Sequence, residues 1–184
     1  MTSYCLPLIL DDRTGELEGG SEFVDVHDRL RLTVRCTAHD TSHTAYMIYN
    51  TSPATFQSII PRALAALDFG PNKSLGTISF GGNAVPMSQY LARTSPLGSS
   101  KVRRFAASDR QTYQWARRTQ ENQEWTCTNI SGYVIASYSL KLAGEPDYSE
   151  SSGCILEIAE QFGALAPEIL ASLWIMRHIV LYDL

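Results

Sequence analysis

Two side chains near the C-terminus, Arg177 and His178, could take part in chemistry because they interrupt an otherwise apolar segment. Polar groups that face an apolar pocket are the usual make-up of a ligand-binding or active site. If the protein is an enzyme, we expect this guanidinium and this imidazole to be its catalytic groups. A second interpretation is structural. Near the C-terminus of a helix, arginine and histidine stabilise the free carbonyls and the helix dipole, and arginine can extend to solvent.

A second group of candidate residues lies between positions 101 and 118, where basic and aromatic side chains are interleaved. This stretch holds six basic residues and a single acidic one, Asp109. Arginine forks bind phosphate or carboxylate oxygens, and aromatic rings suit the interface of a lipid headgroup. The alternative is a solvated strand face whose charges balance the acidic first forty residues. The residues predicted to bind a ligand are Arg103, Arg104, Tyr113, Trp115 and Arg117.

No metal or cofactor is expected. His39, Asp40 and His43 could approach a zinc ion, but their spacing fits no established site and a further strong ligand is not evident. We interpret them as a polar hairpin loop. The sequence also has no Gly-rich phosphate loop, G-x-S-x-G elbow, H-E-x-x-H motif or dinucleotide fingerprint.

Residues 167–183 are predicted to form one helix that is apolar nearly all the way round. Its large apolar side chains occupy three sectors of the helical wheel, and its polar residues share no common face. Such a helix must be enclosed by protein or buried in lipid. Arg177 and His178 interrupt it before the ~20 apolar residues of a membrane span accumulate. We therefore expect no transmembrane segment and predict a central helix enclosed by a sheet.

The chain before this helix has the pattern of successive β-strands. Leu30, Leu32, Val34 and Cys36 alternate with polar residues, as in a strand buried on one face. A second run at 44–51 would complete a hairpin with it. Further strands are predicted at 4–10, 23–26, 76–80, 102–107, 112–116, 124–128, 133–140 and 154–159.

The predicted fold is mainly β: an antiparallel β-barrel of about ten to twelve strands that encloses the C-terminal hydrophobic helix. Closure would remove the exposed edges of so large a sheet. Two segments are less regular. Residues 58–68 contain three alanines and predict a short helix that begins at Pro61, and residues 83–100 are predicted to be a loop or an edge strand.

Composition places the chain among ordinary globular proteins. Its 184 residues are 44% hydrophobic and 18% charged, which predicts one domain over residues 1–184. The net charge of −4 argues against a nucleic-acid binder. The first ten residues carry no basic region, and their apolar run is broken by Pro7, so a secretory signal is not predicted. We expect a cytoplasmic protein with free thiols.

Several motifs follow one another over residues 100–184. Arg104-Phe105 and Tyr113-Gln114-Trp115 precede Gly132-Tyr133-Val134-Ile135-Ala136, then a strand at 153–158 with Leu156-Glu157-Ile158, and finally the apolar helix. This order resembles an uncharacterised family of single-domain proteins of mushroom-forming fungi. The fold implied by the resemblance is similar to the tubby, LURP-one and scramblase superfamily, a barrel threaded by a C-terminal hydrophobic helix. In that superfamily a basic surface binds phosphoinositides. The shared motifs are structural, so they imply shape and not chemistry.

These observations lead to one main functional expectation and two alternatives. The main expectation is binding of a small apolar or amphipathic molecule, which could be an anionic lipid. The first alternative is a cofactor-independent cyclase, isomerase or lyase of fungal specialised metabolism, with its pocket inside the barrel. The second is a structural or partner-binding protein without a pocket. A basic outer patch with a solid interior would favour a lipid surface, whereas an internal cavity would favour a ligand or a reaction.

Overall fold

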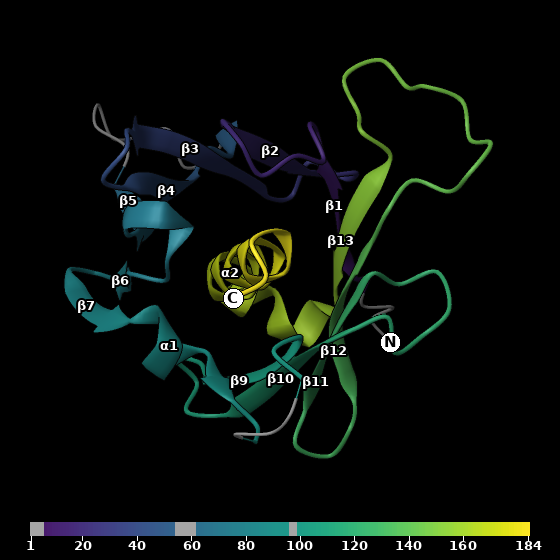
Figure 1. Cartoon of the computed structure of the whole chain (residues 1–184). Helices are drawn as coiled ribbons and strands as arrows, with labels where there is room; N and C mark the ends of the chain where they lie inside the picture. The colour runs from purple at the N-terminus through teal and green to yellow at the C-terminus, as the bar shows by residue number, and fades with distance from the viewer. Residues whose placement is uncertain (1–5, 54–61, 96–98) are drawn as a thin grey trace.

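A computed structural model describes residues 6–53, 62–95 and 99–184. These residues form one antiparallel sheet that curves around a C-terminal helix (Figure 1). The helical elements are α1 (Met87–Tyr90), α2 (Ala166–Leu181) and the 3₁₀ turns η2 (Pro71–Lys73) and η3 (Glu160–Leu165). The strands are β1 (Leu8–Asp12), β2 (Gly20–Asp25), β3 (Arg31–His39), β4 (Thr44–Asn50), β5 (Ala63–Phe69), β6 (Thr77–Phe80), β7 (Asn83–Pro86), β8 (Ala92–Arg93), β9 (Val102–Ala106), β10 (Thr112–Arg117), β11 (Trp125–Asn129), β12 (Val134–Ser139) and β13 (Cys154–Ile158).

The strand order shows how the sheet surrounds the helix. It runs β7-β6-β5-β4-β3-β2-β1-β13-β12-β11-β10-β9-β8, so nearly every strand pairs with its neighbour in sequence. The consecutive strands β7 and β8 do not pair. Besides its pairing with β2, β1 pairs with β13, which brings distant parts of the chain together. This pairing places the N-terminal half of the sheet on one side of α2 and the C-terminal half on the other.

The mainly β fold with a C-terminal helix is confirmed, but the described strands do not close the barrel by hydrogen bonds. Strands β7 and β8 are the two edges, and α1 lies between them (Figure 1). Pro86 ends β7 and has no N–H to donate to a further strand. Met87 and Leu91 are fully buried at this position. Side-chain packing therefore fills the gap where backbone pairing stops.

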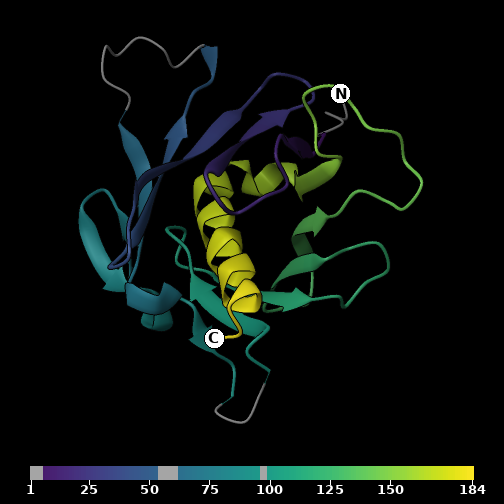
Figure 2. The same ribbon diagram turned by 45° about the horizontal axis from the view of Figure 1, so that its top comes forward.

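The helix α2 is buried on all sides, as its composition predicts. Figure 2 shows it passing through the middle of the strands. Ile169, Leu173 and Ile179 are fully buried, and so are Leu170 and Ile175 in the other sectors of the wheel. Its central polar residue, Ser172, is also buried and accepts a 2.8 Å hydrogen bond from the Trp115 Nε1 atom of β10. The interior of the curved sheet is thus occupied by a protein helix.

One predicted element is wrong over the residues that the structure describes. Residues 63–68 belong to β5 and not to a helix, whereas the start of that predicted helix lies outside the described residues. β5 pairs with β4 on one side and β6 on the other, with Leu67 opposite Tyr46 and Ile78. Ala65 and Leu67 alternate with more exposed residues and face the core. These pairings outweigh the helical preference of alanine, which is a weak local term. Within 83–100, predicted to be a loop or an edge strand, the described residues form the edge strands β7 and β8 and, between them, the short helix α1, which was not predicted; residues 96–98 lie outside the described residues.

The segment Glu160–Leu181 is long and apolar enough to cross a membrane, with a mean hydropathy of 1.4 over its most apolar window. Two thirds of that window (67%) is buried inside the fold. Length and composition of this kind are shared by the core helices of globular proteins. The burial of α2 within the sheet accounts for its hydrophobicity, and no membrane span is established.

Removal of α2 is expected to abolish cooperative folding. Each large apolar side chain contributes about 1.5–3 kcal/mol when buried, and a domain has a net stability of only about 5–15 kcal/mol. We predict that a chain ending at Ala166 is aggregated or molten by near-ultraviolet circular dichroism, whereas a control chain ending at Tyr182 keeps the native spectrum. Cooperative urea unfolding of the shorter chain would contradict the central-helix architecture.

Candidate functional site

The residues predicted to bind a ligand lie on both faces of the sheet. Side chains alternate along β9 and β10, so Arg103, Tyr113 and Trp115 point toward α2 and are buried. Arg104 points to solvent, where its Nε atom donates a 2.9 Å hydrogen bond to Gln114. The stretch that is basic and aromatic in sequence therefore does not form one surface.

Arg103 is part of the interior. It is 3% exposed, its Nη1 donates to the Leu91 carbonyl at 3.2 Å and its Nε donates to the Ser100 carbonyl at 3.2 Å. Burial lowers the pKa of this guanidinium, and the charge of nearby Arg93 lowers it further. These carbonyls belong to the segment that follows α1, so Arg103 stabilises the chain beside the open edge of the sheet. In this position it does not offer its charge to a surface ligand.

Arg117 lies at the end of β10 and is held by two internal contacts. Its guanidinium forms a 2.5 Å ion pair with Glu124. The guanidinium carbon also lies over the ring of Trp125, 5.9 Å from the ring centroid, which is within the ~6 Å limit of a cation–π contact. Arg118 pairs with the same carboxylate at 2.7 Å. Of the predicted ligand-binding residues, only Arg104 presents its charge to solvent without an acidic partner among the described residues.

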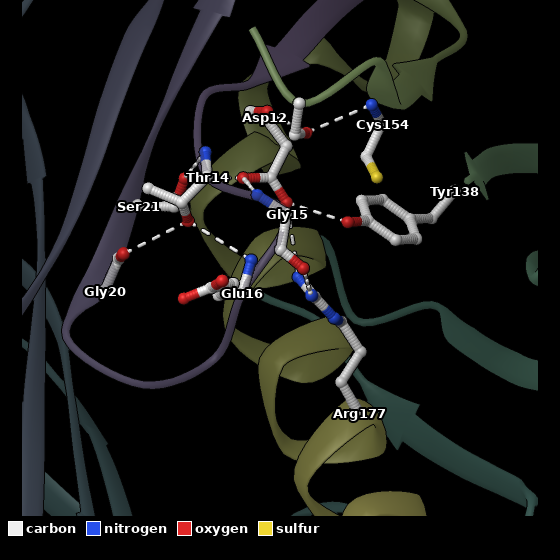
Figure 3. A network of polar contacts seen from close by, with 10 residues as sticks. Asp12, Thr14, Gly15, Glu16, Gly20, Ser21, Tyr138, Cys154 and Arg177 are labelled. Carbon is white, nitrogen blue, oxygen red and sulfur yellow. Dashed lines mark hydrogen bonds and ion pairs between the residues drawn. The ribbon is translucent and has the colours of Figure 1, made fainter. Parts of the chain in front are cut away.

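Arg177 belongs to a buried polar network that joins α2 to β1 and β12 (Figure 3). Its Nη1 atom lies 3.3 Å from Asp12 Oδ2, and its Nη2 donates to the Gly15 carbonyl at 2.6 Å. The Tyr138 hydroxyl donates to the same Asp12 oxygen at 2.7 Å, and the Ser21 hydroxyl donates to the other carboxylate oxygen at 2.5 Å. The carboxylate of Asp12 has no exposed surface. Every member thus has a protein partner, and the network locks α2, β1, β2 and β12 together.

The surroundings of Arg177 leave little room for a substrate. Its guanidinium lies 4.8 Å from the ring centre of Tyr138 and 5.5 Å from that of Trp174. A hollow of about 190 Å³ touches Arg177 beside Trp125 and Leu181 at the end of the helix. Pockets for small ligands usually measure ~300–1,000 Å³. Burial raises the pKa of the Tyr138 hydroxyl, which keeps it a neutral donor to Asp12.

His178 faces the opposite side of α2, so the structure does not bring it together with Arg177. Its ring stacks on Phe69 with 3.8 Å between the centroids, and its Nε2 lies 2.7 Å from the Lys73 carbonyl. Burial lowers the pKa of the imidazole, while the hydrogen bond to Lys73 raises it. A neutral His178 with a proton on Nε2 satisfies this carbonyl. The ring therefore anchors η2 to the helix.

The polar hairpin loop predicted between β3 and β4 is present at residues 40–43. Asp40 Oδ1 accepts hydrogen bonds from the backbone N–H groups of Ser42 and His43, and His43 Nδ1 lies 3.1 Å from Asp40 Oδ2. His39 approaches the Thr44 hydroxyl at 3.4 Å. Within the described ranges, no group of three or more His, Cys, Asp or Glu side chains could hold a metal ion. The polar side chains of this loop therefore hydrogen-bond within the loop and stabilise the turn between β3 and β4.

A large hollow lies on the outer face of the sheet, where β12 and β13 pair. We call it the outer groove, and its volume is about 730 Å³. Ser137 and Glu157 are opposite each other in the register of these strands, whereas their neighbours Tyr138 and Leu156 face the core. The groove is lined by Pro7, Gln123, Tyr133, Val134, Ser137, Glu157, Ala159, Glu160 and Gln161. Apolar and polar groups are therefore present together in a space of ligand size.

The floor of the groove carries a polar side chain. Ser137 is 7% exposed and lines the groove. Its hydroxyl is not among the buried atoms that lack a hydrogen-bond partner, which in the described residues are Arg31 Nε and Tyr90 Oη. The neighbouring Thr126 hydroxyl donates to Gln123 at 2.9 Å. Ser137 is therefore a polar group at the groove floor.

The rim next to Pro7 is fixed by an ion pair between Asp25 and Arg29. Arg29 Nε donates to Asp25 Oδ2 at 2.7 Å, and the Ile9 N–H donates to Oδ1 at 3.0 Å. The same guanidinium donates to the carbonyls of Leu6 and Pro7 at 3.0 and 2.5 Å. The clamp therefore holds the chain before β1 against the end of β2. In this way two residues outside the groove lining position one of its walls.

Sequence reasoning did not identify the outer groove. Its residues come from the chain before β1, from three loops and from the outer faces of β12 and β13. The single local signal was the alternation of Ile155 and Glu157 with buried residues, which marks the outer face of β13. Alternation does not show which strand lies beside β13. No pattern in the sequence therefore brought Ser137 and Glu157 together.

The protein is a curved antiparallel sheet with a central C-terminal helix and an outer groove. The chain belongs to DUF6593, a family of unknown function, whose model matches residues 28–179. Comparison with the curated proteins and with the solved structures found no match. The matched range includes Ser137, Glu157 and Arg177 and leaves out β1, which supplies Asp12.

The buried network predicts a large loss of stability when Arg177 is replaced. In Arg177→Met the carboxylate of Asp12 stays buried without its cation, and loss of one partner of a buried pair typically costs about 3–5 kcal/mol. We expect urea unfolding to show a decrease of this order, with partial recovery in the double variant Asp12→Asn, Arg177→Met. Unchanged stability of Arg177→Met would indicate that the arginine serves a ligand instead of the fold.

The Asp25–Arg29 clamp predicts a dependence of stability on pH. Burial raises the pKa of Asp25, but hydrogen bonds from Arg29 and Ile9 outweigh it and lower the pKa from 3.8 to about 2. The charged carboxylate therefore stabilises the fold above pH 4, and this contribution is lost as the pH falls toward 2. We expect Asp25→Asn to lower the free energy of unfolding by about 1–2 kcal/mol at pH 7. The difference from the wild type should shrink below pH 4, and a constant difference would exclude this role.

Proposed function

We propose that this protein is a binding module for a small amphipathic molecule, which occupies the outer groove. The observation that carries the proposal is the groove itself, a hollow of about 730 Å³ whose lining combines apolar side chains with polar groups. Ligand sites are commonly clefts of ~300–1,000 Å³ with a few placed polar groups. Ser137, which is 7% exposed, supplies one such polar group at the groove floor.

The interior of the sheet is a less suitable place for a ligand. Helix α2 fills it. Two of the largest side chains there, Trp115 of β10 and Trp174 of α2 itself, have 0% and 1% of their surface exposed. The cofactor-independent enzyme considered from the sequence required an open pocket at Arg177 and His178. Both side chains are held by internal partners. The arrangement therefore favours a binding function on the outer face over a reaction inside the sheet.

We further propose a likeness of fold to the tubby, LURP-one and scramblase superfamily. An antiparallel sheet that surrounds a C-terminal apolar helix is the arrangement which that resemblance implies. Phosphoinositide binding needs several free cations on one surface. Arg103 is buried, and Arg117 and Arg118 share the carboxylate of Glu124. The basic residues of this stretch that are exposed and form no ion pair with a described residue are Lys101, Arg104 and Arg110. Half of the basic residues at 101–118 are thus engaged by other groups of the protein, and we propose an amphipathic molecule in the groove ahead of an anionic lipid surface.

Filling the groove should abolish ligand retention without unfolding the protein. Ala159 lines the groove and is half-buried, so Ala159→Phe would place a ring in the space of a ligand. The matched control is Ala106→Phe at an exposed position of β9. Each protein would be incubated with an organic cell extract, and the retained compounds would be identified by native mass spectrometry. We expect a compound held by the wild type and by Ala106→Phe to be lost from Ala159→Phe. Equal retention by all three proteins would place the site elsewhere.

A further inference from the structure

The charges around the outer groove have one sign. Glu157 projects from the outer face of β13 and Glu160 begins η3, and both side chains line the groove and are exposed. Among its described lining residues there is no lysine, arginine or histidine. A concave surface lined by one sign of charge concentrates ligands of the opposite sign. This electrostatic environment favours a cation and disfavours a carboxylate or phosphate.

The nearest arginines are already engaged. Arg29 is close enough for its charge to be felt at Glu160, but it donates to both Asp25 oxygens and to the carbonyls of Leu6 and Pro7. On the other side of Gln123, Arg117 and Arg118 share the carboxylate of Glu124. Glu157 has no ion-pair partner among the described residues. Neither Glu157 nor Glu160 thus forms an ion pair with a described residue, and both carboxylates are accessible to a bound molecule.

The rest of the lining suits the body of an organic ligand. Pro7, Val134 and Ala159 supply aliphatic surface, and the half-exposed ring of Tyr133 completes it. Tyr133 packs on Phe162 with 6.4 Å between the ring centroids, which holds the ring in place. An aromatic face next to carboxylates is a favourable environment for an ammonium group. The buried Ser137 hydroxyl adds one hydrogen-bonding group at the floor.

From these contacts we infer that the ligand of the outer groove is a small organic cation, an amine or quaternary ammonium with an apolar body. Glu157 and Glu160 would bind the charged nitrogen, and Pro7, Val134 and Tyr133 would contact the apolar body. This inference rests on the proposed function and names the chemical class of its ligand. It also separates this protein from an anionic-lipid binder, because the same carboxylates would repel a phosphate.

The test uses three probes with the same eight-carbon chain: octylamine, octan-1-ol and octanoate. Their dissociation constants at pH 7 and low salt would be measured by isothermal titration calorimetry and by amide shifts in NMR spectra. The groove variant is Glu157→Gln, Glu160→Gln. The control variant, Glu121→Gln, Glu145→Gln, removes the same number of charges from loop positions outside the groove lining, where Glu121 is exposed and Glu145 is half-buried. Both variants are expected to keep the wild-type melting temperature, because all four glutamates are at the surface.

We expect octylamine to bind most tightly and octanoate most weakly. Two partly exposed carboxylates should contribute about a five- to tenfold gain in affinity for the amine. The groove variant should lose this gain while its affinity for octan-1-ol is unchanged, and the control variant should bind octylamine within about twofold of the wild type.

Two results would overturn the inference, and they differ from each other. If octan-1-ol or octanoate binds as tightly as octylamine and Ala159→Phe blocks it, the groove is a ligand site but not a cation site. If Ala159→Phe binds all three probes like the wild type, or if none binds to the wild type, the proposed function fails together with the inference. The single variant Glu157→Gln provides a second measure should the double variant unfold, and an unchanged affinity for octylamine would again exclude the cation.

Discussion

The burial of α2 is the constraint on which the rest of the structure depends. A helix with apolar side chains in every sector cannot lie on the surface of a sheet, since part of it would remain in water. The sheet must therefore curve until strands contact the helix from all directions. The few polar groups of the helix then need partners inside the fold. Trp115 provides one for Ser172, Asp12 for Arg177 and the Lys73 carbonyl for His178.

This constraint also influences where a ligand can bind. Many barrels hold their ligands inside, but here the interior volume is occupied by a part of the chain itself. Binding is then left to the outer face, where loops and chain ends form hollows against the strands. The outer groove forms where the pairing of β1 with β13 brings the N-terminal chain beside β12. Its position follows from the pairing of β1 with β13, which joins the two halves of the sheet beside α2.

The basic stretch at 101–118 shows why composition alone is a poor guide to a surface. Residues close together in a strand point to opposite faces, because the side-chain period is two. Arg103 and Arg104 are neighbours in sequence, yet one hydrogen-bonds buried carbonyls and the other faces solvent. A group of like charges in a strand therefore becomes a patch only if its members share a face. Tertiary pairing then decides which of them remain free, as the ion pair between Arg117 and Glu124 shows.

Local patterns were sufficient to predict the faces of most elements. The all-round hydrophobicity of 167–183 determined that the helix is central, and the alternation in β3 and β13 determined which side chains are buried. Those properties follow from the helix and strand periods, which act over a few residues. The tertiary structure alone decided that residues 63–68 form a strand, since pairing with β4 and β6 outweighed the helix preference of alanine.

The contacts that define the sites were also decided only by tertiary structure. Asp12 and Arg177 are 165 residues apart, and the outer groove unites Pro7, Ser137 and Glu157. The sequence determined that each of these residues lies on a given face of its element. It did not determine which elements become neighbours, because strand order and register depend on the summed packing of the whole sheet around α2.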